Sequence, residues 1–145
     1  MSATRRAITT AVATAAMTLA AACATGPSEL HLFTIAKPAL GGEALFHGML
    51  LAKHGCVIVN QANGETTILF DPGVALTENR DGLRDARTGK TVHFRKLIRG
   101  GAADLRSGGR GWSVADIEGF FGVSIDGGCP TGNVMRLHDM QELEQ

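Results

Sequence analysis

Short apolar runs with the alternation or the β-branched content of strands occupy most of the chain after residue 43. Strands are predicted at 46–52, 56–60, 66–70, 83–86, 91–97 and 134–137. Val, Ile, Thr and Phe are frequent in these runs, and such side chains favour pleated surfaces. Asn63-Gly64 separates the second and third runs and predicts a tight hairpin, because both turn residues must accept a positive φ. The stretch 87–90, which contains Gly89, predicts a second hairpin.

One helix is predicted after Ser113. Ser113 is a favourable N-cap, and Asp116 three residues later completes a weaker version of the capping box. The helix is short, and we expect its apolar side to pack on the strands; that side consists of Ile117, Phe120 and Phe121. Five to six short strands with one short helix predict a mainly β domain in the form of a small OB-like β-barrel. The strand count also fits a small sandwich.

The first 22 residues carry the pattern of a cleaved signal peptide. Arg5 and Arg6 form a short basic start, residues 7–22 carry no charge, and three alanines precede Cys23. In such leaders the basic end stays on the cytoplasmic side while the uncharged stretch enters the bilayer. A permanent transmembrane helix needs roughly 20 predominantly apolar residues. This stretch is shorter and rich in Ala and Thr, so we expect it to be removed on export.

Two cleavage routes fit the end of the leader. The sequence LAAAC at 19–23 resembles the lipobox of bacterial lipoproteins, in which the Cys is diacylated and becomes the mature N-terminus. Ala20-x-Ala22 also suits ordinary signal peptidase, which would give a periplasmic or secreted chain with a free thiol at Cys23. Three cysteines in an exported chain leave one unpaired. Lipidation of Cys23 removes the odd one and leaves Cys56 and Cys129 to form a disulfide.

The chain divides into a signal peptide at 1–22, a flexible tether at 23–42 after the lipidated Cys, a small β-barrel domain at 43–138 and a polar tail at 139–145. Within the tether, a short strand or packing on the domain is the alternative for the apolar residues Leu30, Leu32, Phe33 and Ile35. The full chain has 14 basic and 14 acidic residues, so removal of the two leader arginines leaves 12 basic residues against 14 acidic ones. This slightly acidic balance, with no long run of one sign, favours neither nucleic acid nor an anionic membrane surface as a partner. No nucleic-acid partner is expected.

The polar residues form no recognisable catalytic or metal-binding motif. His47, His54 and Cys56 lack the close ligand pairs of structural zinc sites, so neither a metal nor another cofactor is predicted. The residues around Ser124 resemble a nucleophile elbow, but Asp126 stands where that motif has Gly, and the chain has no βαβ series. A small envelope hydrolase that uses Ser124 or a His/Asp pair is the alternative function.

Arg110 and Trp112 are the predicted ligand-binding rim. Arg110 lies near the end of the glycine-rich stretch 100–111, and Trp112 follows it. This stretch is expected to be the most flexible part of the chain. An Arg and a Trp on a mobile loop at the rim of a barrel can stack on a ligand. The competing interpretation is that Trp112 plugs the end of the barrel, because Trp is highly buried on average.

Several short motifs together resemble those of an uncharacterised family of small bacterial exported proteins and lipoproteins. They are a strand that begins with Gly-Cys at 55–59, a strand that ends in a Pro-Gly turn at 69–73, a glycine-rich turn at 108–109, and the late Cys129. The resemblance covers 46 to about 137. It implies a small OB-like β-barrel with a disulfide, and it implies no known activity.

The residues therefore favour an envelope-anchored, non-enzymatic binding or structural lipoprotein of unknown ligand. Its expected partners are the membrane, through the N-terminal lipid, and an envelope protein or a small ligand. Ala24 follows Cys23 where an inner-membrane retention signal has Asp, which favours the outer membrane. A metal-binding or redox module is a third hypothesis.

Overall fold

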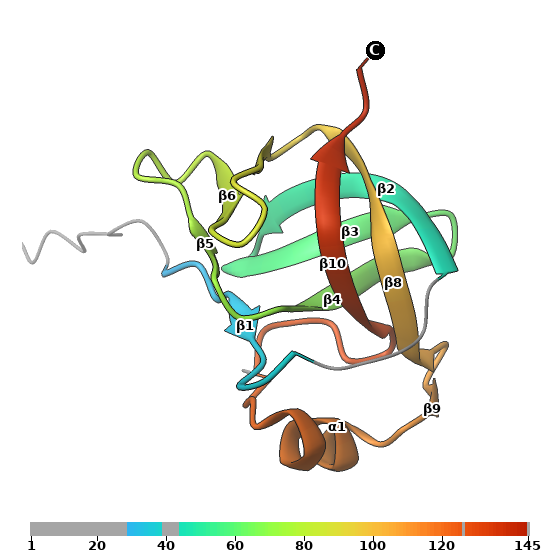
Figure 1. The fold of residues 1–145 in the computed structure, drawn as a ribbon. Coiled ribbons are helices and arrows are strands. Elements are labelled where there is room, and N and C mark those ends of the chain that lie inside the picture. The colour runs from blue at the N-terminus through green and yellow to red at the C-terminus, as the bar shows by residue number, and fades with distance from the viewer. Residues whose placement is uncertain (1–28, 39–43, 126, 145) are drawn as a thin grey trace, which may run out of the picture.

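The structure is a computed structural model that describes residues 29–38, 44–125 and 127–144. It is mainly β with one short helix, as predicted (Figure 1). The elements are β1 (Phe33–Thr34), β2 (Ala44–Lys53), β3 (Cys56–Gln61), β4 (Gly64–Phe70), β5 (Val74–Leu76), β6 (Gly82–Asp85), β7 (Thr91–His93), β8 (Leu97–Ser107), β9 (Arg110–Gly111), α1 (Val114–Phe121) and β10 (Val134–Glu142). The predicted leader at 1–22 and Cys23 lie outside the described residues.

The main sheet has seven strands, and five of them pair with one another in succession. These pairs are β2 with β3, β3 with β4, β4 with β10, β10 with β8, and β8 with β2. Of these five pairs, β4 and β10 run parallel and the other four are antiparallel. These five pairings form a closed cycle: followed from β2 through β3, β4, β10 and β8, they return to β2. The short strands β1 and β9 add to the sheet, β1 parallel to β4 and β9 antiparallel to β8.

The predicted hairpin between β3 and β4 is confirmed, but the turn lies one residue earlier than predicted: Gln61 pairs with Gly64, so Ala62 and Asn63 form the turn. Of the predicted turn residues Asn63 and Gly64, Gly64 has a positive φ, 111°, and Asn63 does not.

Both faces are buried in the first part of β3 and the last part of β4, which explains the continuous apolar runs at 56–59 and 68–70. Val57 and Val59 contribute to a first core with residues of β2, β8 and β10. Cys56 and Ile58, which alternate with them, contribute to a second core. Leu69 of β4 joins the second core, whereas its neighbours on either side join the first. A strand covered on both faces shows no apolar–polar alternation.

A smaller sheet of β5, β6 and β7 packs against the first core. Val74, Leu83 and Val92, one from each strand, are buried in that core. The predicted hairpin at 87–90 is confirmed, because β6 and β7 pair in antiparallel fashion on either side of it. The predicted strand at 91–97 is interrupted, however, because Arg95 adopts a positive φ of 65° and the chain turns there into β8.

The glycine-rich stretch expected to be flexible lies largely within β8, one of the longest strands. A Cβ on Gly100 would lie 2.7 Å from the backbone oxygen of His138, and a Cβ on Gly101 would overlap the His138 ring. The two glycines therefore allow β10 to approach β8 closely. The strand β10 continues to Glu142, so the predicted tail at 139–145 begins within a strand that pairs with β8.

The described part of the predicted tether, residues 29–38, packs against the domain. The His31 N–H donates to Gly55 O over 2.6 Å, and the Val57 N–H donates to His31 O over 3.2 Å. Phe33 and Thr34 then pair with the end of β4, and Phe33 and Ile35 are buried in the second core. We name residues 30–38 the N-terminal strap. The ordered domain therefore includes residues that precede the predicted boundary at 43.

The helix has the predicted cap. Ser113 Oγ accepts from the Asp116 N–H over 3.1 Å, and Gly122 ends the helix at a φ of 66°. Ile117 and Phe121 are buried beneath the helix as expected, but Phe120 is 68% exposed. Among the described residues, no helix is both long and apolar enough to cross a membrane.

The predicted Cys56–Cys129 disulfide is present. Cys56 begins β3 and Cys129 lies in the segment between α1 and β10, 73 residues later. Both residues are buried in the second core, beside Ile58 and Ile117. The bond therefore ties the loop that follows the helix to the centre of the main sheet.

Loss of the disulfide is expected to lower the free energy of unfolding by about 4 kcal/mol, because a loop of this length restricts the unfolded chain strongly. Urea unfolding with and without reductant, compared with a Cys56→Ala/Cys129→Ala variant, measures the effect. Reductant should not change the stability of the double variant. Equal stability of the reduced and oxidised wild type would contradict the prediction.

Candidate ligand-binding site

Trp112 lies outside the two cores and stacks with the helix. Trp112 is 42% exposed, and its backbone N–H donates to the backbone oxygen of Leu105 over 3.0 Å. The Trp112 and Phe120 rings meet edge to face with centroids 5.2 Å apart, and the Phe120 and Phe121 rings do so at 4.9 Å. Trp112 therefore packs on the outward side of α1, and is not a core plug. We name Trp112, Phe120 and Phe121 the aromatic patch.

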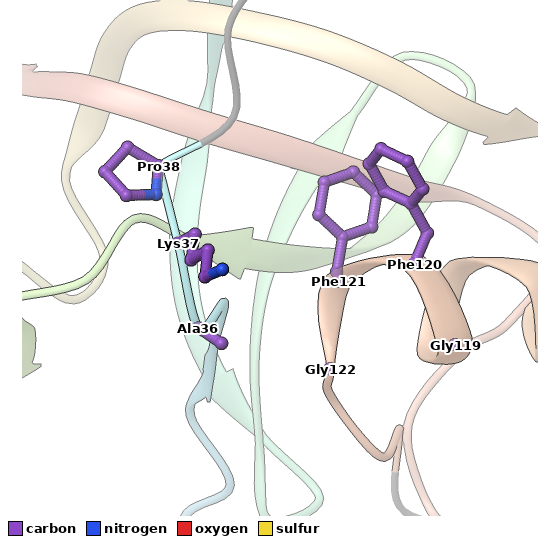
Figure 2. A pocket seen from close by; sticks show the side chains of 7 residues that line it. All are labelled: Ala36, Lys37, Pro38, Gly119, Phe120, Phe121 and Gly122. Atoms are coloured by element: carbon purple, nitrogen blue, oxygen red, sulfur yellow. The ribbon is translucent and has the colours of Figure 1, made fainter.

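A groove of about 520 Å³ adjoins the aromatic patch. Ala36, Lys37 and Pro38 form one wall, and the last turn of α1 with its Gly122 cap forms the other. Figure 2 shows the Phe120 and Phe121 rings rising from the helix on one side, opposite the backbone that carries Lys37 and Pro38. The Ala36 N–H donates to Phe121 O over 3.3 Å and joins the two walls. The groove therefore lies between the N-terminal strap and the helix.

The segment that carries Trp112 is held in place by hydrogen bonds. The Arg106 guanidinium donates to Trp112 O and to Thr131 O, both over 2.9 Å. The Gly108 N–H donates to Asn133 Oδ1 over 2.7 Å. These bonds link the end of β8 to the segment before β10. The expectation of a flexible loop is therefore wrong for this segment, because Arg106 and Asn133 supply bonding partners that lie far along the chain.

Arg110 belongs to a different hollow. It is exposed in β9 and lines a space of about 360 Å³ with Asp104, Leu105 and Ser107. The structure thus associates Trp112 with Phe120, and Arg110 with the neighbouring strand β8. The sequence hypothesis included Arg110 and missed Phe120. The signal that could have revealed Phe120 is its place between Gly119 and Phe121 in a helix too short to bury every apolar residue.

The residues of the hydrolase alternative are only partly assembled. Ser124 is exposed in the segment after α1, and Asp126 lies outside the described residues. In the described part of the chain no hydrogen bond joins Ser124 to a histidine. A His–Asp pair does exist elsewhere: His138 Nδ1 lies 2.9 Å from Asp139 Oδ2 at a bulge of β10, where Asp139 has a φ of 52°.

Two ion pairs, Arg87 with Asp139 and His93 with Glu142, tie the small sheet region to β10. Asp139 contacts both His138 and Arg87, and its pKa lies below the ordinary value because of the hydrogen bond from His138 and then that from Arg87. His93 Nδ1 lies 2.6 Å from Glu142 Oε1. Burial alone would raise the pKa of Glu142, but the hydrogen bonds from the His93 ring and backbone, with the nearby positive charges, lower it overall.

Comparisons with protein-family models, with curated proteins and with solved structures find no match. Within the described residues, no group of three or more His, Cys, Asp or Glu side chains is arranged to hold a metal ion. The groove of about 520 Å³ has exposed aromatic side chains, Phe120 and Trp112, at or beside its edge.

Stability is expected to fall as the pH drops below about 4, because carboxyl groups whose pKa is lowered by folding stabilise the folded state only while ionised. The contribution is present above the unfolded-state pKa and is lost as the pH falls through the folded-state pKa. Urea unfolding at about pH 7, 4 and 3 measures it. The loss of unfolding free energy at low pH should be smaller in the double variant Asp139→Asn/Glu142→Gln than in the wild type. In the exposed control Glu78→Gln it should be the same as in the wild type. An equal decline in all three proteins would contradict this assignment.

Proposed function

We propose that the protein is an envelope-anchored, non-enzymatic binding lipoprotein whose binding site is the aromatic patch with the adjoining groove. One observation carries the proposal: Phe120 and Trp112 are 68% and 42% exposed, side by side, at the edge of a 520 Å³ hollow. Exposed apolar surface of this kind, gathered at one place, is typical of interaction sites. Aromatic rings are also the side chains that contribute most to such contacts.

The strand order supports the finer assignment of the fold as an OB-like barrel. Taken in chain order, β2, β3, β4, β8 and β10 are its first to fifth strands, and each pairs with two others. OB-fold proteins bind ligands through the loops between strands one and two and between strands four and five. The aromatic patch lies in the connection from β8 to β10, which is the second of these loops. This support is an analogy between folds.

Cysteine pairing supports the anchor. The disulfide occupies Cys56 and Cys129, so Cys23 is the remaining cysteine of the chain. A disulfide is expected in exported proteins, and its presence agrees with the signal-peptide pattern. We place the mature protein in the bacterial cell envelope, with the outer membrane favoured over release into the periplasm.

The mature protein from the membrane fraction of an expressing bacterium is expected to carry acyl groups on Cys23. Intact mass with and without reductant measures both features: an acyl-sized increment, and a gain of two hydrogens on reduction of the disulfide. A Cys23→Ser variant should leave the membrane fraction or retain its leader. An unmodified wild-type chain in the soluble fraction would contradict the anchor.

Phe120→Ala is expected to weaken binding of a small aromatic probe, anilinonaphthalene sulfonate, with a loss of less than about 1 kcal/mol in the free energy of unfolding, because Phe120 is mostly exposed. The neighbouring Phe121→Ala should cost about 3 kcal/mol, because Phe121 is buried. Probe fluorescence and urea unfolding measure the two effects. Equal destabilisation by both substitutions would show that Phe120 belongs to the core and would remove the site.

A further inference from the structure

We infer that the aromatic patch inserts into the lipid bilayer beside the Cys23 anchor and so orients the domain on the membrane. The inference rests on the proposed function and names the partner of the same site, a zwitterionic lipid surface. Trp and Phe at the edge of an apolar hollow are the side chains that favour the boundary between hydrocarbon and headgroups. Phe120 offers a largely exposed phenyl ring, and Trp112 an indole with a polar N–H.

The length of the chain keeps the patch within reach of the proposed anchor. Ala36, where one wall of the groove begins, follows Cys23 by 13 residues, and a fully extended segment of that length spans at most about 45 Å. From residue 30 onward this segment belongs to the N-terminal strap, which contains β1 (Figure 1) and meets α1 where the Ala36 N–H donates to Phe121 O. The segment that leaves the anchor therefore forms part of the site itself.

The anchor makes even a weak contact between the patch and the lipid effective. Once Cys23 holds the chain on the bilayer, insertion of the patch is an intramolecular step, so its effective concentration is high. A soluble ligand gains no such advantage from the position of the groove beside the strap. The position of the site relative to the predicted anchor therefore favours lipid over a soluble ligand as the occupant.

The charges around the patch predict an apolar contact that depends little on salt. Lys37 is exposed in the groove wall and suits the phosphate level of a bilayer. Asp116 is one helical turn before Phe120 and hydrogen-bonds with Ser113 at the start of α1. The Arg106 guanidinium, which donates to Trp112 O, and Glu118 of the same helix add a further charge of each sign, so neither sign dominates near the patch. Apolar burial then provides the affinity, and anionic lipids are not required.

Trp112 is the only tryptophan of the chain, so tryptophan emission reports on this site alone. The lipidated mature protein is reconstituted in phosphatidylcholine vesicles whose acyl chains carry bromine, which quenches indole at short range. We expect Trp112 emission to shift to shorter wavelength and to be quenched by the brominated lipid, and to be protected from aqueous acrylamide. Emission that stays fully accessible to acrylamide and insensitive to bromine would overturn the inference.

Variants separate the patch from the anchor. In the non-lipidated Cys23→Ser protein, Phe120→Ala is expected to lower partition into phosphatidylcholine vesicles about tenfold, since one exposed phenyl ring is lost. Leu45→Ala, which removes another highly exposed apolar side chain outside the patch, should leave partition unchanged. Equal effects of the two substitutions would contradict insertion at the patch.

Different outcomes contradict the Cys23 anchor and the membrane insertion of the aromatic patch. A chain that is lipidated at Cys23 but whose Trp112 remains in water keeps the anchor and overturns membrane insertion of the patch. Emission changed by a second copy of the protein in solution, and not by vesicles, also overturns it. A chain without lipid whose Trp112 is nevertheless quenched by brominated vesicles supports insertion and contradicts the anchor.

Discussion

The outer face of β3 and β4 carries Cys56, Ile58 and Leu69, which water would reach if nothing covered that face. The cover consists of the N-terminal strap, α1 and the segment that contains Cys129. Because these parts are distant in the chain, burial of one apolar face brings the start and the end of the domain together. The disulfide lies within this cover and prevents its separation from the main sheet. The second core thus determines where the strap and the helix lie.

The aromatic patch is a consequence of this arrangement. Successive helix residues are about 100° apart, so a helix that turns Ile117 and Phe121 toward the sheet leaves Phe120 at the edge of its buried side. Trp112, just before the cap, packs against the ring that the helix leaves exposed. The strap supplies the opposite wall because Ile35 is buried beneath it. The same packing that stabilises the domain therefore creates the exposed site.

Local patterns predicted the elements whose cause is local. The hairpin before β4 depends on Gly64, which tolerates a positive φ, and the Ser113 cap follows from a side-chain oxygen near free N–H groups. The Cys56–Cys129 pair follows from counting cysteines in an exported chain. The strap lies in the predicted tether because its residues show no sustained periodicity, although apolar residues such as Phe33 and Ile35 allow a short strand that packs on the domain. Its strand pairs with β4, more than 30 residues away, so the strap sequence does not reveal the partner.

The sequence by itself determined the β class, the hairpins, the helix start and the disulfide, since each depends on neighbouring residues or on a count. The tertiary structure alone decided which apolar residues stay exposed. Trp112 and Phe120 are large apolar residues of the kind that usually fill a core. They stay exposed because the area beneath a two-turn helix is limited. The tertiary structure also decided the role of Gly100 and Gly101 in β8. They allow close packing of β10 and do not provide flexibility, because the His138 backbone and ring occupy the space where side chains would be.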